Sequence, residues 1–183
     1  MNTSEQPEQE VFDITIVGGG PVGLFGLFYA GLRGLRAKLI DSLGELGGQL
    51  ITLYPEKYIY DVAGYPKVLA KDLVKSCIEQ GLRFNPVVCL EEKVIELSYH
   101  PARLICLRTD KGEHWTRAII LTVGVGAFEP KKLSLPNIER LEGRGIFYFV
   151  KEKQIFADKT VLIVGGGDSA VDWALMLNDI AKK

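Results

Sequence analysis

Residues 12–23 read FDITIVGGGPVG, an apolar run that ends in the glycine fingerprint Gly18-x-Gly20-x-x-Gly23. The run predicts a strand, and the residues from Pro21 onward predict a helix. Glycines at this spacing let a strand turn sharply into a helix, and they let the backbone approach a pyrophosphate at the positive end of that helix. The stretch therefore predicts the first βα turn of a Rossmann-like dinucleotide-binding domain.

A carboxylate follows this fingerprint at the distance that dinucleotide binding requires. Asp41 comes 18 residues after Gly23, at the end of the apolar run 36–40, which predicts a second strand. A carboxylate in that position accepts hydrogen bonds from an adenosine ribose. The alternatives are a solvated aspartate in a turn and, for the glycines, a tight turn with a purely structural role.

A second fingerprint, Gly165-x-Gly167-x-x-Ala170, follows the apolar run 160–164. Alanine is accepted at the third position because a methyl group still lets the helix and the strand pack closely. Two dinucleotide sites in one chain indicate a flavoprotein that is reduced by a nicotinamide.

Two polar residues stand where the helix after this second fingerprint is expected to begin. The oxygens of Asp168 and Ser169 are placed to accept hydrogen bonds from free N–H groups of the first turn. For Asp168 we expect capping rather than ligand contact.

The predicted fold class is α/β, with two Rossmann-like dinucleotide-binding domains. The first carries a β-meander and is expected to bind a flavin dinucleotide, and the second, which is truncated in this chain, is expected to bind a nicotinamide dinucleotide. The predicted parts are a disordered acidic tail over 1–10, the flavin dinucleotide domain over 11–127, and a hinge near 128–130 with the start of the nicotinamide dinucleotide domain over 128–183. The predicted strands are 12–17, 36–40, 86–97, 103–109, 114–123 and 160–164, and the predicted helices are 21–32, 69–80 and 168–180. Residues 121–124 are apolar on both faces, which predicts a strand buried within the sheet.

Composition argues against several classes of partner. The 183 residues carry a net charge of −1, which offers no field for gathering nucleic acid or an anionic membrane. Residues 1–10 contain no Lys or Arg and no apolar stretch, so they do not resemble a secretory signal. The longest apolar stretch, around 24–32, is well short of the ~18 residues that span a bilayer. The protein is therefore expected in the cytoplasm.

The cysteines and histidines form no recognisable motif. Cys77, Cys89 and Cys106 stand singly, without CxxC spacing, and are expected to be small buried hydrophobic residues. His100 and His114 have no paired carboxylate or cysteine at metal-ligand spacing. Both histidines are expected to be structural, and no metal site is predicted.

Four longer stretches carry a family resemblance. They read LGGQL over 46–50, LYPEKYIYDVAGYP over 53–66, GVGAFEP over 124–130 and GGGDSAVDWAL over 165–175. Together they closely resemble the thioredoxin-reductase-like ferredoxin–NADP reductases. The likeness covers nearly all of the chain after the acidic tail. Its most specific part is the tyrosine-rich stretch, because the GGQ and GGGDSA elements recur in true thioredoxin reductases.

The resemblance implies where FAD lies. It places the pyrophosphate at the first fingerprint, the ribose at Asp41, the flavin near Gln49 and the adenine near the backbone of Val94. It also implies that Tyr54 lies against the isoalloxazine ring, where an aromatic face buries apolar area, and that Phe128 lines the flavin site. Ordinary packing is the alternative for Tyr54, Val94 and Phe128. The residues expected to bind FAD or NADP are Gly18, Gly20, Val22, Gly23, Asp41, Gln49, Tyr54, Val94, Phe128, Gly165, Gly167, Asp168, Ser169 and Ala170.

The activity that the resemblance implies is electron transfer between NADPH and ferredoxin. Where thioredoxin reductases carry a CxxC dithiol, this chain reads YFVKEK over 148–153, so flavin electrons have no thiol pair to reach by exchange. A flavin converts a two-electron hydride into single-electron steps, which suits a ferredoxin or flavodoxin-type carrier. The resemblance also implies a homodimer, and no catalytic acid or base is expected. The alternatives are a disulfide reductase that uses a partner thiol, an NADPH oxidase, and an inactive truncated FAD-binding fragment.

Overall fold

The computed structural model describes residues 10–53, 55–100, 103–126, 132–150 and 152–183. The chain divides into two compact units, Met1–Lys132 and Leu133–Lys183. The hinge predicted near 128–130 lies outside the described residues, as do residues 1–9 of the predicted acidic tail. Each unit is described by itself.

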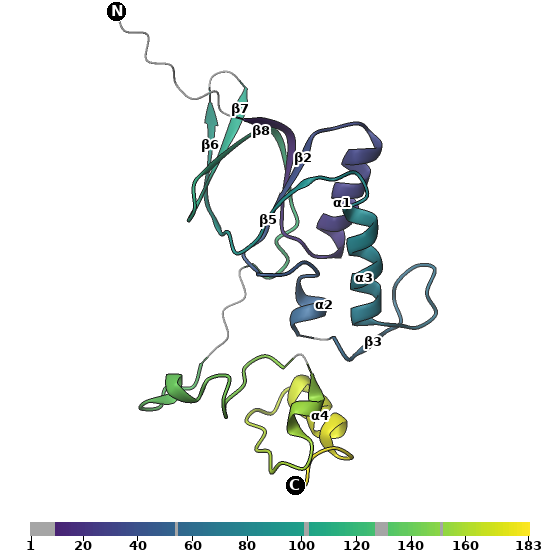
Figure 1. Cartoon of the computed structure of the whole chain (residues 1–183), viewed down its shortest axis with the longest axis vertical. Coiled ribbons are helices and arrows are strands. Elements are labelled where there is room, and N and C mark those ends of the chain that lie inside the picture. The colour runs from purple at the N-terminus through teal and green to yellow at the C-terminus, as the bar shows by residue number, and fades with distance from the viewer. Residues whose placement is uncertain (1–9, 54, 101–102, 127–131, 151) are drawn as a thin grey trace, which may run out of the picture. The chain divides into compact units, whose positions relative to one another are not determined.

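The first unit is built on a six-stranded sheet with the order β5-β2-β1-β8-β7-β6. The neighbouring strands β5, β2, β1 and β8 run parallel to one another. Next to β8, the strands β7 and β6 continue the sheet in antiparallel fashion (Figure 1). The strands are β1 (Val11–Val17), β2 (Ala37–Ile40), β5 (Val87–Cys89), β6 (Val94–His100), β7 (Leu104–Thr109) and β8 (Glu113–Leu121). This arrangement confirms the predicted α/β class and the predicted meander.

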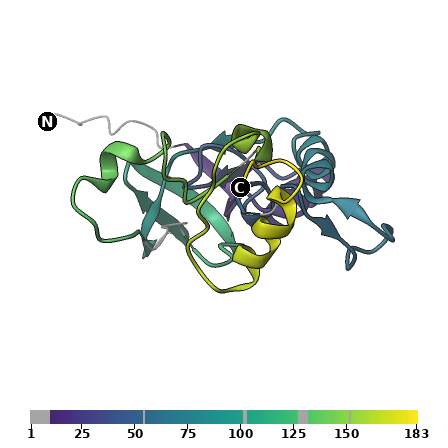
Figure 2. The same cartoon turned by 90° about the horizontal axis from the view of Figure 1, so that it is seen from below.

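Helices cover one face of the parallel part. They are α1 (Pro21–Leu32) and α3 (Ala70–Gly81), which lie side by side (Figure 1), with the short α2 (Gln49–Thr52) near the end of α3. A small hairpin, β3 (Tyr58–Ile59) with β4 (Val68–Leu69), leads into α3. Figure 2 shows this hairpin extending away from the large sheet.

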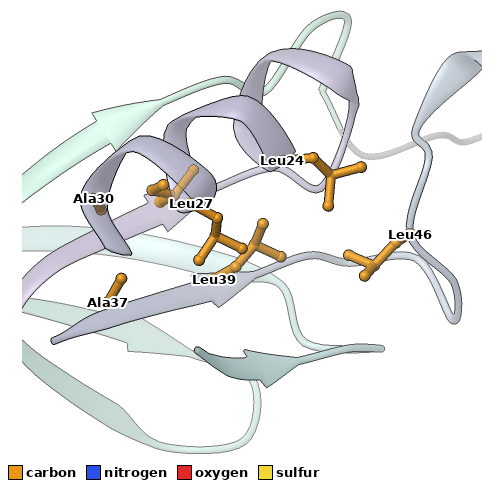
Figure 3. Close-up of a cluster of buried hydrophobic side chains, with 7 residues drawn as sticks. Leu24, Leu27, Ala30, Ala37, Leu39 and Leu46 are labelled. Atoms are coloured by element: carbon orange, nitrogen blue, oxygen red, sulfur yellow. The ribbon is translucent and has the colours of Figure 1, made fainter. Parts of the chain in front are cut away.

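The core lies between α1 and the sheet. Helix α1 has no charged residue, and every third or fourth side chain faces the strands, as helical periodicity requires. Figure 3 shows Leu24, Leu27 and Ala30 pointing toward Ala37 and Leu39 of β2. Burying one leucine side chain stabilises a fold by about 1.5–3 kcal/mol, so this cluster anchors the helix that follows the glycine turn. A smaller cluster of Val17, Ile40 and Leu107 lies on the opposite face of the sheet.

The structure corrects the strand predicted over 86–97. The segment is two strands, β5 and β6, which lie at opposite edges of the sheet. Residues 90–93 cross between the edges, and Glu91 has a left-handed backbone with φ +54° that turns the chain. Because the apolar pattern continues through this turn, the sequence pattern does not reveal where the strand breaks.

A second correction concerns residues 121–124, which were expected to be buried on both faces. Strand β8 ends at Leu121, whose side chain is 63% exposed, and Val123 is exposed as well. Between β2 and α3, where no helix or strand was predicted, the chain also forms α2, β3 and β4.

The described part of the second unit contains one α-helix, α4 (Asp168–Leu177), and two 3₁₀ turns, η1 (Ile138–Leu141) and η2 (Lys153–Phe156). Aromatic rings pack beside the helix: Phe156 meets Trp173 edge to face at 6.5 Å and Phe147 at 5.4 Å. The helix ends three residues before the predicted Ile180.

The strand predicted over 160–164 does not form in the described residues, and Leu162 is 85% exposed. Two backbone hydrogen bonds join this run to the end of the chain, from Lys182 N to Lys159 O at 2.9 Å and from Val161 N to Lys183 O at 2.8 Å. A strand needs a continuous row of such bonds, and two do not make one.

Among the described residues, none of the helices combines the length and apolar character that crossing a membrane requires.

Candidate functional site

The first fingerprint forms a tight turn between β1 and α1. Gly18 has a φ of +108°, and a Cβ there would lie 2.4 Å from the carbonyl oxygen of Thr122. A Cβ on Gly23 would lie 1.9 Å from the carbonyl oxygen of Gly18. These two glycines are therefore required by the fold itself, because a side chain at either position overlaps backbone.

Gly20 has a different environment. It is the N-cap residue of α1 with a φ of −71°, and a Cβ on it would meet no atom within 4 Å. The free N–H groups of the first helical turn, including those of Val22 and Gly23, lie next to this open space. No side chain caps them, and the exposed Val22 lies on the outside of the helix. The space at Gly20 fits an anionic group that approaches the backbone closely.

Asp41 lies at the end of β2 and reaches this turn. Its side chain is buried, with 8% exposed, and Oδ2 accepts a hydrogen bond from Gly19 N at 2.5 Å. Oδ1 accepts a second bond from Leu43 N at 2.8 Å. Each carboxylate oxygen has two lone pairs, so both retain capacity for a ribose hydroxyl. The structure brings Asp41 to the glycine turn, and its contact with ribose stays a prediction.

The GGQ element packs against the same turn. Gly47 N donates to Gly19 O at 2.9 Å, and Gly48, with φ +58°, comes so close that a Cβ on it would lie 3.0 Å from the Cα of Gly20. The next residue, Gln49, has its Nε2 atom 3.2 Å from the place of a Cβ on Gly124. Gln49 therefore lies between the glycine turn and the segment that follows β8.

Of the remaining residues expected around the flavin and adenine, one is described. Val94 is half-buried at the start of β6 and packs on the cluster of Val17, Ile40 and Leu107. Its role at the adenine stays a prediction. Tyr54 and Phe128 lie outside the described residues.

The second fingerprint forms a separate glycine turn in the second unit. Gly165 has a φ of +139°, and Gly167 is the N-cap residue of α4. The predicted capping by Asp168 is wrong: Asp168 is the first helical residue, and no side chain makes a cap hydrogen bond. Ser169 is exposed beside it, while Ala170 is half-buried with its Cβ 3.8 Å from the place of a Cβ on Gly165. Gly167 supplies no side chain to cap the free N–H groups of the first turn of α4.

Sequence reasoning missed a buried polar cluster next to Asp41. Glu92, on the crossover between β5 and β6, is 7% exposed, and its Oε1 atom accepts hydrogen bonds from Thr109 Oγ1 at 2.7 Å and His114 Nε2 at 2.6 Å. His114 Nδ1 lies 3.0 Å from Nζ of Lys38, which is 6% exposed. An ammonium group only donates, so Nδ1 is the acceptor and the ring hydrogen lies on Nε2.

His114 thus has a carboxylate partner, although not one at metal-ligand spacing in the sequence. Glu92 and His114 are 22 residues apart, and Lys38 and His114 are 76 apart, so no local spacing reveals the cluster. The available signal was Lys38 itself, a charged residue within the buried strand AKLI. His100 stacks edge to face on Trp115 at 5.5 Å, in agreement with a structural role. No group that could hold a metal ion is found in the described part of the chain.

Acid should remove the contribution of Glu92 to stability. Burial raises the pKa of Glu92, but the hydrogen bonds from Thr109 and His114 and the charge of Lys111 outweigh it and hold this pKa below its usual range. The contribution is therefore present above about pH 4.3, the usual value for glutamate, and is lost as the pH falls through the lower folded value. We expect the difference in unfolding free energy between the wild type and Glu92→Gln to shrink as urea titrations are taken to lower pH. A constant difference would contradict this account.

The cysteines are in environments that oppose thiolate chemistry. Burial raises the pKa of the Cys77 thiol above its usual range. Burial, followed by the Glu92 carboxylate, raises the pKa of Cys89, and burial, followed by Glu113, raises the pKa of Cys106. A raised pKa lowers the thiolate fraction that exchange requires. All three are free thiols; Cys106 is buried as expected, whereas Cys77 and Cys89, which were also expected to be buried, are only half-buried.

Known proteins resemble this chain in sequence and in fold. A family model described as pyridine nucleotide-disulphide oxidoreductase matches residues 12–183. The chain is 51% identical over 175 residues to a protein named ferredoxin–NADP reductase from Halalkalibacterium halodurans, covering 96% of this chain and 53% of that protein. It is 51% identical over 176 residues to ferredoxin–NADP reductase 2 of Bacillus subtilis, again covering 96% and 53%. The chain thus spans about half the length of the curated relatives it matches, and the matches confirm the resemblance inferred from the sequence.

Solved structures agree at the level of the fold. The thioredoxin reductase of Lactococcus lactis superposes with a TM-score of 0.73 at 25% identity, over 94% of this chain and 54% of that one. The thioredoxin reductase of T. acidophilum gives a TM-score of 0.74 at 19% identity, over 96% and 55%. The second likeness shows the fold alone.

Proposed function

Because the chain belongs to the pyridine nucleotide-disulphide oxidoreductase family, we propose that it holds FAD at the first glycine turn and serves as the amino-terminal part of a ferredoxin–NADP reductase. The observation that carries the proposal is the open space at Gly20, next to the buried carboxylate of Asp41. An anion fits in this space, because a Cβ on Gly20 would meet no atom within 4 Å, and a side chain there would occupy the place that the anion needs. The relatives named ferredoxin–NADP reductase, which are 51% identical to this chain in sequence, support the same assignment.

The chain's own residues would bind and orient the cofactor. The backbone at Gly20 and the first turn of α1 would receive the pyrophosphate, Asp41 would accept from the ribose, and Gln49 would lie toward the flavin. When bound, FAD supplies the redox chemistry, because it accepts a hydride from NADPH and releases electrons singly to a carrier. No side-chain acid or base is required for that step.

We assign the second glycine turn to the nicotinamide dinucleotide. Gly165, Gly167 and Ala170 form the turn that leads into α4, and the uncapped N–H groups of the first turn of α4 would receive the NADP phosphates. On this assignment, 11–127 belongs to the FAD-binding domain and 128–183 begins the NADP-binding domain. The observed division of the chain at Lys132 lies close to that boundary.

The partners follow from the same proposal. The acceptor would be a ferredoxin or flavodoxin-type carrier, the enzyme would be a homodimer, and it would act in the cytoplasm. The near-neutral net charge is consistent with a soluble electron-transfer protein and offers no field for nucleic acid.

Cofactor binding is the direct test. The purified chain is titrated with FAD, and binding is measured by flavin fluorescence quenching, followed by anaerobic addition of NADPH and recording of flavin bleaching. We expect saturable FAD binding. A chain that folds and takes up no FAD would favour the alternative of an inactive fragment.

A disulfide reductase is the second candidate, because thioredoxin reductases share the fold. It predicts that thioredoxin with a disulfide substrate accepts electrons faster than ferredoxin with cytochrome c. The proposal predicts the reverse, and rapid reduction of thioredoxin would overturn it.

Replacing all three cysteines should leave flavin reduction intact. The variant Cys77→Ala, Cys89→Ala, Cys106→Ala removes every thiol of the chain, and the raised thiol pKa values already argue against exchange chemistry. Bleaching of bound FAD by NADPH is expected at a rate within about twofold of the wild type, as for residues outside the redox path. Loss of bleaching in a variant that retains FAD and its melting temperature would contradict the proposed route.

A further inference from the structure

The crossover between β5 and β6, residues 90–93, is fastened to Asp41 on one side, together with Cys89 at the end of β5. Asp41 N donates to Cys89 O at 2.9 Å, and Glu92 N donates to Asp41 O at 3.0 Å. A third bond runs from Glu91 N to Leu43 O at 2.9 Å. The backbone of Asp41 is thus held between Cys89 and the crossover, while its side chain holds the N–H groups of Gly19 and Leu43.

On the other side, the crossover is fastened to the turn between β7 and β8. Lys93 N donates to Asp110 Oδ1 at 2.9 Å, and Asp110 N donates to Lys93 O at 3.1 Å. Lys111 Nζ donates to Leu90 O at 3.2 Å. The meander therefore fixes the crossover, and the crossover fixes Asp41.

The side chain of Glu92 is the buried centre of this connection. Its carboxylate binds Thr109 on β7 and His114 on β8, and His114 continues to Lys38 on β2. Lys38 Nζ also lies 4.1 Å from the centre of the Phe12 ring. A buried carboxylate is costly unless its hydrogen bonds are kept, so this cluster holds the crossover in one position.

We propose that Glu92, His114 and Lys38 are positioning residues, which act through Asp41 to set how the first glycine turn receives the ribose of a dinucleotide. The cluster touches neither the proposed pyrophosphate space at Gly20 nor the proposed flavin side at Gln49. Its effect is therefore specific to the ribose end of the site. That the ligand is a dinucleotide rests on the proposed function, whereas the coupling between Glu92 and Asp41 does not depend on it.

The coupling is tested first without ligand. In Glu92→Ala, the amide hydrogens of Gly19 and Leu43, which bond to Asp41, should exchange about tenfold faster than in the wild type, the effect of weakening one buried hydrogen-bonded connection. The matched control is Glu96→Ala on β6, because the Glu96 carboxylate pairs with Arg108 at the exposed surface. Equal exchange at Gly19 and Leu43 in both variants would overturn the inference.

The ribose effect is tested with two nucleotides, ADP and 2′,3′-dideoxy-ADP, whose phosphates are the same and whose ribose hydroxyls differ. Glu92→Ala should weaken ADP binding about tenfold and leave dideoxy-ADP binding nearly unchanged. Glu92→Gln keeps an acceptor oxygen and should recover most of the affinity. An equal loss for both nucleotides would mean a purely structural role and would overturn the inference.

The two experiments separate the inference from the proposed function. If the wild type binds neither nucleotide nor FAD, the proposed function fails, and amide exchange still decides whether Glu92 positions Asp41. If FAD binds but Glu92→Ala leaves exchange and nucleotide preference unchanged, the inference alone fails.

Discussion

Gly20→Val is expected to abolish FAD binding while the first unit unfolds at the wild-type temperature. The backbone at Gly20 has an ordinary φ of −71°, and a Cβ there meets no atom within 4 Å, so the fold tolerates a side chain. The added isopropyl group would fill the space that the pyrophosphate needs. Overlap of this kind costs about 3 kcal/mol, which corresponds to a loss of FAD affinity of roughly 100-fold or more. FAD titration and a melting curve measure the two quantities.

The matched control is Gly145→Val in the second unit. Gly145 also has open space around its position for a Cβ and no positive φ, but it lies in neither fingerprint. It should leave FAD binding and the melting temperature of the first unit unchanged. If the Gly20→Val protein retains FAD, and so its yellow colour, after purification, the pyrophosphate does not bind at Gly20.

Gly23→Ala should have the opposite pattern, because it damages the fold before it affects any ligand. Its Cβ would lie 1.9 Å from the carbonyl oxygen of Gly18, a backbone atom that also receives the hydroxyl of Thr122 at 2.8 Å. The turn must therefore open to admit one methyl group. We expect a loss of about 3 kcal/mol or more in unfolding free energy, measured by urea denaturation without FAD.

Gly26→Ala on the same helix is the control for Gly23→Ala. Its Cβ would lie 3.1 Å from Cδ1 of Ile16, the end of a side chain that can shift. Alanine also favours a helix over glycine by about 1 kcal/mol, so the net change should be small. Equal urea midpoints for the two variants would show that a Cβ on Gly23 does not overlap the carbonyl oxygen of Gly18.

The local features of the first glycine turn were predictable because each is carried by a short stretch of chain. The apolar run before Gly18 and the uncharged helix after it agree with their predicted bounds to within one residue. Asp41 was identified from its spacing to Gly23, since a strand of known rise places its end at the glycine turn. The three cysteines were also identified as free thiols, from their spacing alone.

Other features depended on contacts that no local pattern contains. The apolar run 160–164 was expected to be a strand, but strand formation requires neighbours for its N–H and C=O groups, and the described chain supplies only Lys182 and Lys183. Likewise, the strand predicted over 86–97 breaks where the chain leaves one edge of the sheet for the other. Hydrophobic periodicity reports which face is buried, and it does not report which strand lies alongside.

The sequence by itself therefore determined the βα turn, its glycines, the carboxylate that reaches it and the family to which they point, because backbone chirality and apolar periodicity act over a few residues. Only the tertiary structure decided that Gly20 faces open space while Gly23 is closed by backbone, and that Lys38, His114 and Glu92 meet beneath Asp41. The cluster joins chain segments 22 to 76 residues apart, which become neighbours only when the sheet and its crossover assemble.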